Sequence, residues 1–177
     1  MKQKYIVSDT NIFLDLMSVD LLAAFFSLSF EFHTTDFVIA EIKNGEQRKK
    51  IDEYVENGKL FITQFDNSEM KELNDYHNSY WNKISIQDCS VWLCAKKMCA
   101  RLLTGDALLR KLVKLENTVE VSGILFVFEE MIEQSIITKV QACEKLESLM
   151  CINPRLPKTA CNEKITLWSK KRRRNNE

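Results

Sequence analysis

The sequence lacks any pair of cysteines at Cys-x-x-Cys spacing, although it contains six cysteines in 177 residues. No histidine lies close to a cysteine along the chain either. Structural zinc is held by clustered cysteine and histidine ligands, so this spacing argues against a zinc site. We interpret the cysteines as reduced residues of the core.

Long apolar runs and a leader sequence are also missing. No run approaches the roughly 18 apolar residues that a membrane-spanning helix needs. The first residues do not have the pattern of a secretory signal peptide. These absences predict a cytoplasmic protein without a membrane partner.

The chain has no excess of charge, because 25 basic and 25 acidic residues cancel. Five of the basic residues are consecutive, at positions 170–174, and without residues 170–177 the chain has 20 basic and 24 acidic residues, a balance of −4. A mildly acidic body is not typical of a general nucleic-acid binder, so a polyanionic substrate would need local basic patches or this run. The run itself is either a solvated chain end or a contact for nucleic acid.

What the sequence does contain is an alternation of short apolar strands and amphipathic helices, with no repeat or linker. The expected strands are residues 5–7, 31–33, 60–65, 100–104 and 119–126. Because parallel strands need crossover connections, which are usually helical, this alternation predicts the α/β class. We expect a three-layer α/β/α sandwich around a mostly parallel sheet, with one domain over residues 1–157 and a polar, basic tail over residues 158–177.

The stretch YIVSDTNIFLDL places a carboxylate, Asp9, between a buried strand and a helix. An aspartate there can cap the helix by accepting hydrogen bonds from its first turn. In open parallel sheets, however, ligands bind beyond the carboxyl ends of the strands, where the strand order reverses. Asp9 is therefore a candidate for either role.

Three more acids occupy comparable positions, and each has a structural alternative. Glu41 could be an exposed helix residue, Asp88 the partner of Ser85 in a capping box, and Asp106 an N-cap. Parallel strands would gather all four acids at one edge of the sheet, where two carboxylates about 4 Å apart repel by about 4 kcal/mol at an effective dielectric of 20. Such a cluster must share protons or bind a cation, and ligands that are all oxygen favour Mg²⁺ or Mn²⁺ over zinc.

Four motifs, in this order, resemble those of the PIN-domain nucleases over nearly the whole chain. They are Asp9-Thr10-Asn11 after a hydrophobic strand, Glu41 in FVIAEI, Asp88 in SIQDCSVWLCA, and Thr104-Gly105-Asp106 after the fourth strand. Residues 121–149 are also similar to the distal helical hairpin of the bacterial, toxin-like branch of that family. Ser135 departs from the pattern, since a glycine is common between those two helices.

The resemblance implies a metal-dependent endoribonuclease that hydrolyses RNA. By this resemblance, Mg²⁺ or Mn²⁺ would be ligated or oriented by four acids: Asp9, Glu41, Asp88 and Asp106. One or two such ions would lower the pKa of a water, hold the phosphate and offset charge on the leaving oxygen. RNA is the implied substrate, and the toxin-like branch implies an antitoxin protein as a partner. A homodimer is a separate expectation, and the sequence leaves the oligomeric state open.

Two polar residues beside these acids, Asn11 and Thr104, have two interpretations. They could orient a metal ligand or a bound water, or they could cap their helices. The sequence does not decide between these roles.

Three other functions compete with this interpretation. A phosphatase of the haloacid-dehalogenase type needs a second aspartate two residues after the first, where Asn11 stands. A receiver-like signalling domain needs an adjacent acidic pair and a lysine after the last strand, and VSDTN and VEVSG contain neither. A catalytically inactive binding or scaffold module with the same fold stays open, because a fold does not fix a function.

Overall fold

The computed structural model describes residues 4–80 and 83–170, so residues 171–174 of the basic run lie outside the described residues. The strands are β1 (Tyr5–Ser8), β2 (Glu31–Thr35), β3 (Leu60–Thr63), β4 (Arg101–Leu103) and β5 (Val121–Ser122). The helices are α1 (Thr10–Ser18), α2 (Leu22–Phe25), α3 (Asp36–Glu41), α4 (Gly45–Glu56), α5 (Asn67–Ser79), α6 (Ile86–Lys97), α7 (Ala107–Glu116), α8 (Ile124–Glu133), α9 (Lys139–Ile152) and α10 (Lys158–Ser169).

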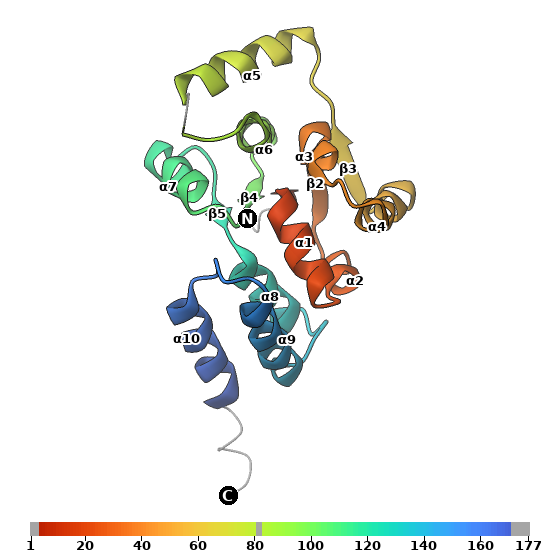
Figure 1. Ribbon diagram of the computed structural model, residues 1–177, viewed down its shortest axis with the longest axis vertical. Helices are drawn as coiled ribbons and strands as arrows, with labels where there is room; N and C mark the ends of the chain where they lie inside the picture. Colours follow the sequence, from red (N-terminus) through yellow and green to blue (C-terminus); the bar gives the residue numbers. More distant parts are fainter. Residues whose placement is uncertain (1–3, 81–82, 171–177) are drawn as a thin grey trace, which may run out of the picture.

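The five strands form one sheet in the order β3-β2-β1-β4-β5, and every neighbouring pair is parallel. Helices α5 and α6 lie together on one side of the sheet, and α1, α2, α8 and α9 lie on the other (Figure 1). The predicted α/β class and the layered arrangement around a parallel sheet are therefore confirmed.

Polar side chains define where many helices begin, because an N-cap oxygen satisfies amide groups that have no partner within the helix. Capping boxes open α5, with Asp66 and Glu69, and α9, with Thr138 and Gln141. Helix α4 is followed by Gly58, whose φ of +64° is a conformation that glycine adopts without steric cost.

The core lies on both faces of the sheet. Between the sheet and α2, the rings of Phe25, Phe26 and Phe32 pack together at centroid distances from 4.3 to 5.3 Å. Of the cysteines interpreted as core residues, Cys89, Cys94 and Cys161 are buried; Cys143 is half-buried, and Cys99 and Cys151 are exposed. Within the described residues, no helix is both long and apolar enough to cross a membrane.

The last expected strand, residues 119–126, is shorter than predicted. Only Val121–Ser122 pair with β4, and the chain enters α8 at Ile124. The reason is the spacing of the apolar residues, since Ile124, Val127, Phe128 and Met131 recur at helical intervals and are all buried. An apolar run that short cannot be assigned to strand or helix from its hydrophobicity alone.

The chain beyond residue 157, expected to be a polar tail, continues as helix α10 up to Ser169. Cys161 and Trp168 are buried there, and the Trp168 ring stacks on Phe128 of α8 at 6.2 Å. Lys164 pairs with Glu129 of α8. Apolar residues at wide spacing in a polar segment are a weak sequence signal, so the sequence alone does not predict this helix.

Candidate active site

The sheet reverses its strand order between β1 and β4. From β1 the chain adds β2 and β3 on one side, whereas β4 and β5 lie on the other. The amide of Asp9 donates to the Leu103 carbonyl at 2.9 Å, and the amide of Thr104 donates to the Ser122 carbonyl at 3.0 Å. The residues that follow β1 and β4 therefore meet at the position where parallel α/β sheets bind ligands.

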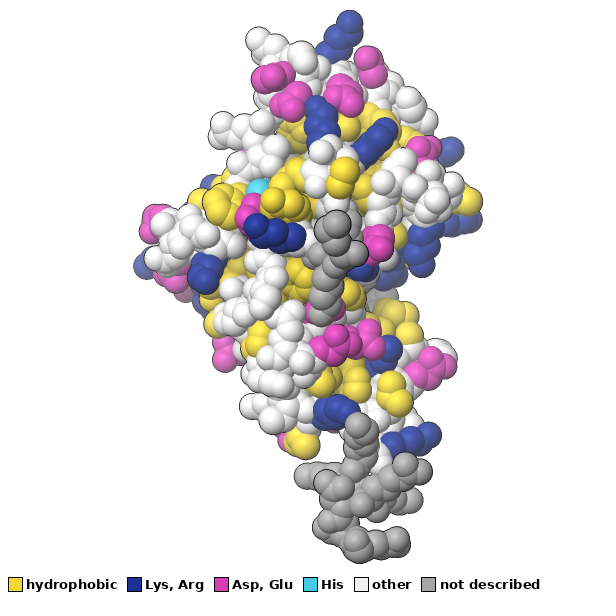
Figure 2. Space-filling model, turned by 180° about the vertical axis from the view of Figure 1, so that it is seen from behind, with side chains coloured by type: hydrophobic (Ala, Val, Ile, Leu, Met, Phe, Trp, Pro, Cys, Tyr) yellow, Lys and Arg dark blue, Asp and Glu magenta, His cyan; other side chains and the backbone are white. Residues whose placement is uncertain are grey.

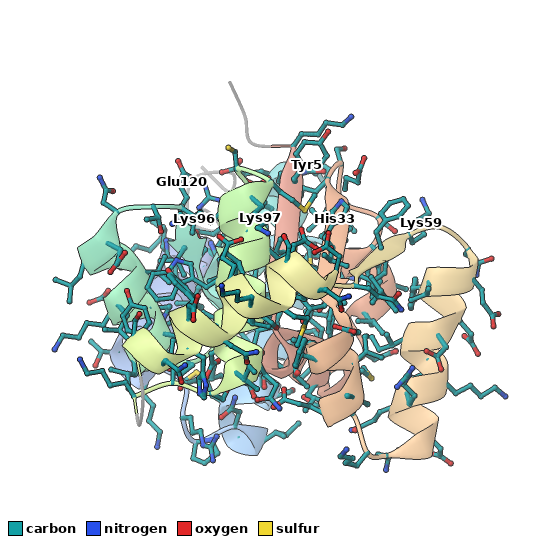
Figure 3. All side chains as sticks on the ribbon, turned by 90° about the horizontal axis from the view of Figure 1, so that it is seen from above. Tyr5, His33, Lys59, Lys96, Lys97 and Glu120 are labelled. Carbon is teal, nitrogen blue, oxygen red and sulfur yellow. The ribbon has the colours of Figure 1, made fainter. Side chains whose placement is uncertain are left out.

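Figure 3 shows the side of the sheet where the amino ends of the strands lie, opposite to the side of Asp9 and Thr104. Tyr5, Lys59 and Glu120 mark the amino ends of β1, β3 and β5, and they lie along one side of the molecule in that view. Because all strands are parallel, Asp9 and Thr104 lie toward the other edge.

Asp9 is almost completely buried, with 3% of its surface exposed. Its Oδ1 accepts a hydrogen bond from the Thr10 amide at 2.7 Å, and its Oδ2 accepts from Thr104 Oγ1 at 2.9 Å and Asn11 Nδ2 at 3.2 Å. Burial raises the pKa of Asp9 from 3.8 to about 6, and the negative charge of Asp88 adds to the rise. Asp9 is thus both the N-cap of α1 and a carboxylate in an unfavourable electrostatic environment.

Thr104 joins two of the candidate acids through one hydroxyl. Its Oγ1 donates to Asp9 and accepts a hydrogen bond from the Asp106 amide at 3.0 Å. Asp106 in turn caps α7 by accepting from the Leu109 amide at 2.6 Å. Thr104 is fully buried, so these bonds fix the orientation of Asp9 relative to the start of α7.

Glu41 reaches this region through Thr10, the residue after Asp9. Glu41 is exposed, and its Oε2 accepts a hydrogen bond from Thr10 Oγ1 at 2.6 Å. It is the last residue of α3, which is only six residues long. Its charge contributes to the raised pKa of Asp9.

Asp88 is half-buried, and its Oδ2 accepts hydrogen bonds from the Ser85 amide at 3.0 Å and the Ser85 hydroxyl at 2.8 Å. Burial raises the pKa of Asp88, and the charge of Asp106 raises it further. The charges of Asp88 and Glu41 thus act on Asp9, and the charge of Asp106 acts on Asp88.

The structural alternatives for these acids are also real. Asp9 and Asp106 cap helices, and Asp88 forms a capping box with Ser85. Capping uses only part of each carboxylate, since an ionised carboxylate accepts about four hydrogen bonds. Within the described residues, one oxygen each of Glu41, Asp88 and Asp106 accepts no hydrogen bond, and no lysine or arginine pairs with any of the four acids.

These donors have the chemistry that Mg²⁺ or Mn²⁺ prefers, because all are carboxylate oxygens. As the side chains are placed, however, no three histidine, cysteine, aspartate or glutamate side chains in residues 4–80 and 83–170 are grouped closely enough to hold a metal ion. The donor set fits a hard divalent cation, whereas a bound ion would require the carboxylates to turn toward one another.

A groove of about 800 Å³ opens beside this group. Asn11, Gly105 and Asp106 line it, and so do residues 153–157 of the loop between α9 and α10. Sequence reasoning missed two features of this region. Thr10, which holds Glu41, lies inside the quoted Asp-Thr-Asn motif, and Arg110 lies one helical turn after Asp106.

The PIN-domain family matches residues 5–170, so the chain belongs to the PIN-domain family. PIN domains are generally nucleases, and they generally use divalent metal ions. No curated protein matches the chain. The crystal structure of FitAcB from Neisseria gonorrhoeae is similar with a TM-score of 0.41 and 15% identity, over 66% of this chain and 95% of that one. A likeness so distant carries no further conclusion.

Proposed function

We propose that this protein is a metal-dependent endoribonuclease whose site consists of Asp9, Glu41, Asp88 and Asp106. The observation that carries the proposal is the buried Asp9, which lies among other carboxylates without a cationic partner in the described residues. Repulsion among carboxylates costs free energy of folding, so such acids must either share protons or bind a cation, and the oxygen-only donors here suit the cation.

The proposal assigns different roles to the side chains. Asp9, Asp88 and Asp106 would hold Mg²⁺ or Mn²⁺ together with Glu41, and such an ion activates water and stabilises charge at a phosphate when bound. Thr104 and Asn11 hold Asp9 in one orientation by donating to Oδ2. Thr10 restrains Glu41 in the same way. A carboxylate of this group would accept the proton of the attacking water.

We extend the proposal to an antitoxin protein partner on the resemblance of residues 121–149 alone, and we keep a homodimer as a separate proposal. In the structure this segment is the α8–α9 hairpin. Ser135, where the family commonly has glycine, has a φ of 59°. That conformation is one that glycine adopts more readily than serine.

An inactive binding module is the second candidate. The observation in its favour is that no three metal-ligating side chains converge among the described residues. The two candidates differ in what they predict for metal binding, because an inactive module has no need for the ion.

Cleavage and thermal unfolding together test the proposal. The purified protein should cut a mixed RNA pool with Mn²⁺ or Mg²⁺ and stop when EDTA is added. Mn²⁺ at 100 times its Kd should stabilise the fold by about 2.7 kcal/mol, since it binds only the native state. An Asp9→Ala, Asp106→Ala double variant should lose both effects. Absence of cleavage and of any metal-dependent rise in Tm would favour the inactive module.

A further inference from the structure

The groove beside the carboxylates carries positive charge at two places. Arg110 of α7 and Arg155 of the α9–α10 loop are the only lysines or arginines among its lining residues. One acid of the wall, Asp15, is held by a hydrogen bond from Asn153 Nδ2 at 2.9 Å. On the face shown in Figure 2, acidic, basic and apolar side chains are mixed. A polyanion reaching the carboxylates through the groove therefore meets these two guanidinium groups.

Arg110 differs in its partners from the other arginines on the described helices and strands. Arg48 pairs with Asp52, and Arg101 pairs with Glu120. Arg110 is half-buried, yet within the described residues its guanidinium makes no hydrogen bond or ion pair. A partly desolvated guanidinium without an anion is costly to maintain unless a ligand supplies one.

The Arg110 guanidinium lies against Gly123, in space that a side chain at position 123 would occupy. A Cβ atom at position 123 would be only 2.6 Å from Arg110 Nη1, whereas the nearest backbone atom, the Thr104 carbonyl oxygen, would be 3.5 Å away. The backbone angles of Gly123, φ −117° and ψ −165°, are extended and open to any residue. A side chain at this position would therefore displace the flexible Arg110 guanidinium, whereas the backbone conformation itself does not require glycine.

We propose that Arg110 is the phosphate-positioning residue for the RNA strand, which runs from the carboxylates along the groove toward Arg155. This inference rests on the proposed ribonuclease function. Arginine suits the role because its planar fork donates two parallel hydrogen bonds to a phosphate. Its position one turn after Asp106 places this contact beside the proposed metal ligands, so it would align a neighbouring phosphate and not take part in the reaction.

Steady-state cleavage of a fluorescently labelled single-stranded RNA with Mn²⁺ tests this role. Arg110→Gln should raise KM about tenfold or more, because a hydrogen bond to a charged group is worth about 1.5–3 kcal/mol, and should leave kcat within about threefold. Arg110→Lys should fall between wild type and Arg110→Gln. The salt slope of log KM should become shallower by about 0.7 when one phosphate contact is lost.

Gly123→Ala provides an independent variant, since it displaces the guanidinium without removing its charge. It should raise KM in the same direction, and adding it to Arg110→Gln should change nothing further. Lys49→Gln is the matched control, because it removes one exposed positive charge from α4 and should leave KM unchanged. Unfolding curves of all variants establish that they fold.

The possible results separate this inference from the function on which it rests. If the wild-type protein cleaves RNA and both Arg110→Gln and Gly123→Ala keep the wild-type KM, Arg110 does not position RNA and the ribonuclease assignment stands. A fall in kcat at unchanged KM would overturn the inference in the same way. If the wild-type protein cleaves no RNA with Mn²⁺, the proposed function fails first and the inference fails with it.

Discussion

Helices α5 and α6 begin with the same capping motif but in different electrostatic surroundings. In α5 the Glu69 carboxylate accepts the Asp66 amide at 2.9 Å, and in α6 the Asp88 carboxylate accepts the Ser85 amide at 3.0 Å. The hydrogen bond to the Asp66 amide lowers the pKa of Glu69, and Lys97 lowers it further. Burial raises the pKa of Asp88 in spite of its hydrogen bonds from Ser85.

The difference comes from the neighbours of each box. Lys97 Nζ lies 3.1 Å from Glu69, whereas the neighbour that acts on Asp88 is the carboxylate of Asp106. Glu69 therefore has all the features of a structural cap. Asp88 has the same hydrogen bonds together with a repulsive environment, so capping alone does not account for its position.

The largest expected difference between the two boxes is in RNA cleavage. Asp88→Asn keeps an oxygen for the Ser85 amide but removes the charge, and it should lower kcat/KM with Mn²⁺ at least about 100-fold. Glu69→Gln is the matched change in α5 and should leave kcat/KM unaltered. Full activity of Asp88→Asn would mean that Asp88, like Glu69, serves only as a helix cap.

The second difference is in how stability depends on pH without metal. Because the folded-state pKa of Asp9 is about 6 and its ordinary value is 3.8, the folded protein keeps this proton over a window in which the unfolded chain loses it. Stability should fall as pH rises through that window, by about 2–3 kcal/mol. Asp9→Asn removes this loss, so denaturant unfolding should find the variant more stable than wild type at about pH 7.5 and not at about pH 4.

Glu69→Gln should show the opposite trend and serves as the control. A lowered pKa contributes stability above the ordinary value of 4.5, and this contribution disappears as pH falls through the folded-state pKa. The variant should therefore be less stable than wild type near neutral pH and equal to it in acid. Parallel pH profiles for Asp9→Asn and Glu69→Gln would contradict the contrast between the two regions.

The smallest expected effect concerns the caps themselves. Ser85→Ala and Asp66→Ala each remove an N-cap side chain, and each should lower the free energy of unfolding by about 1 kcal/mol. Differential scanning calorimetry should show similar shifts in Tm for both variants. A much larger loss for Ser85→Ala would mean that its hydroxyl holds Asp88 against repulsion as well as capping α6.

Much of this arrangement was predictable, because its signals are local in sequence. Asp9, Asp88 and Asp106 each follow a strand or open a helix, and the Thr104-Gly105-Asp106 turn follows an apolar strand. The α/β class follows from the alternation of these segments. The extent of β5 and the packing of α10 were not predictable, since both depend on which surface covers Ile124 and Trp168.

The sequence by itself determined the class of fold, the order of the strands and helices, and the four acids at their junctions, because hydrophobic periodicity and capping act within a few residues. Only the tertiary structure decided that Thr104, 95 positions after Asp9, donates to its carboxylate, and that Gly123 leaves room for the Arg110 guanidinium. It also decided the raised pKa of Asp9, because burial and the charge of Asp88 arise only when the parallel strands bring their carboxyl ends to one edge of the sheet.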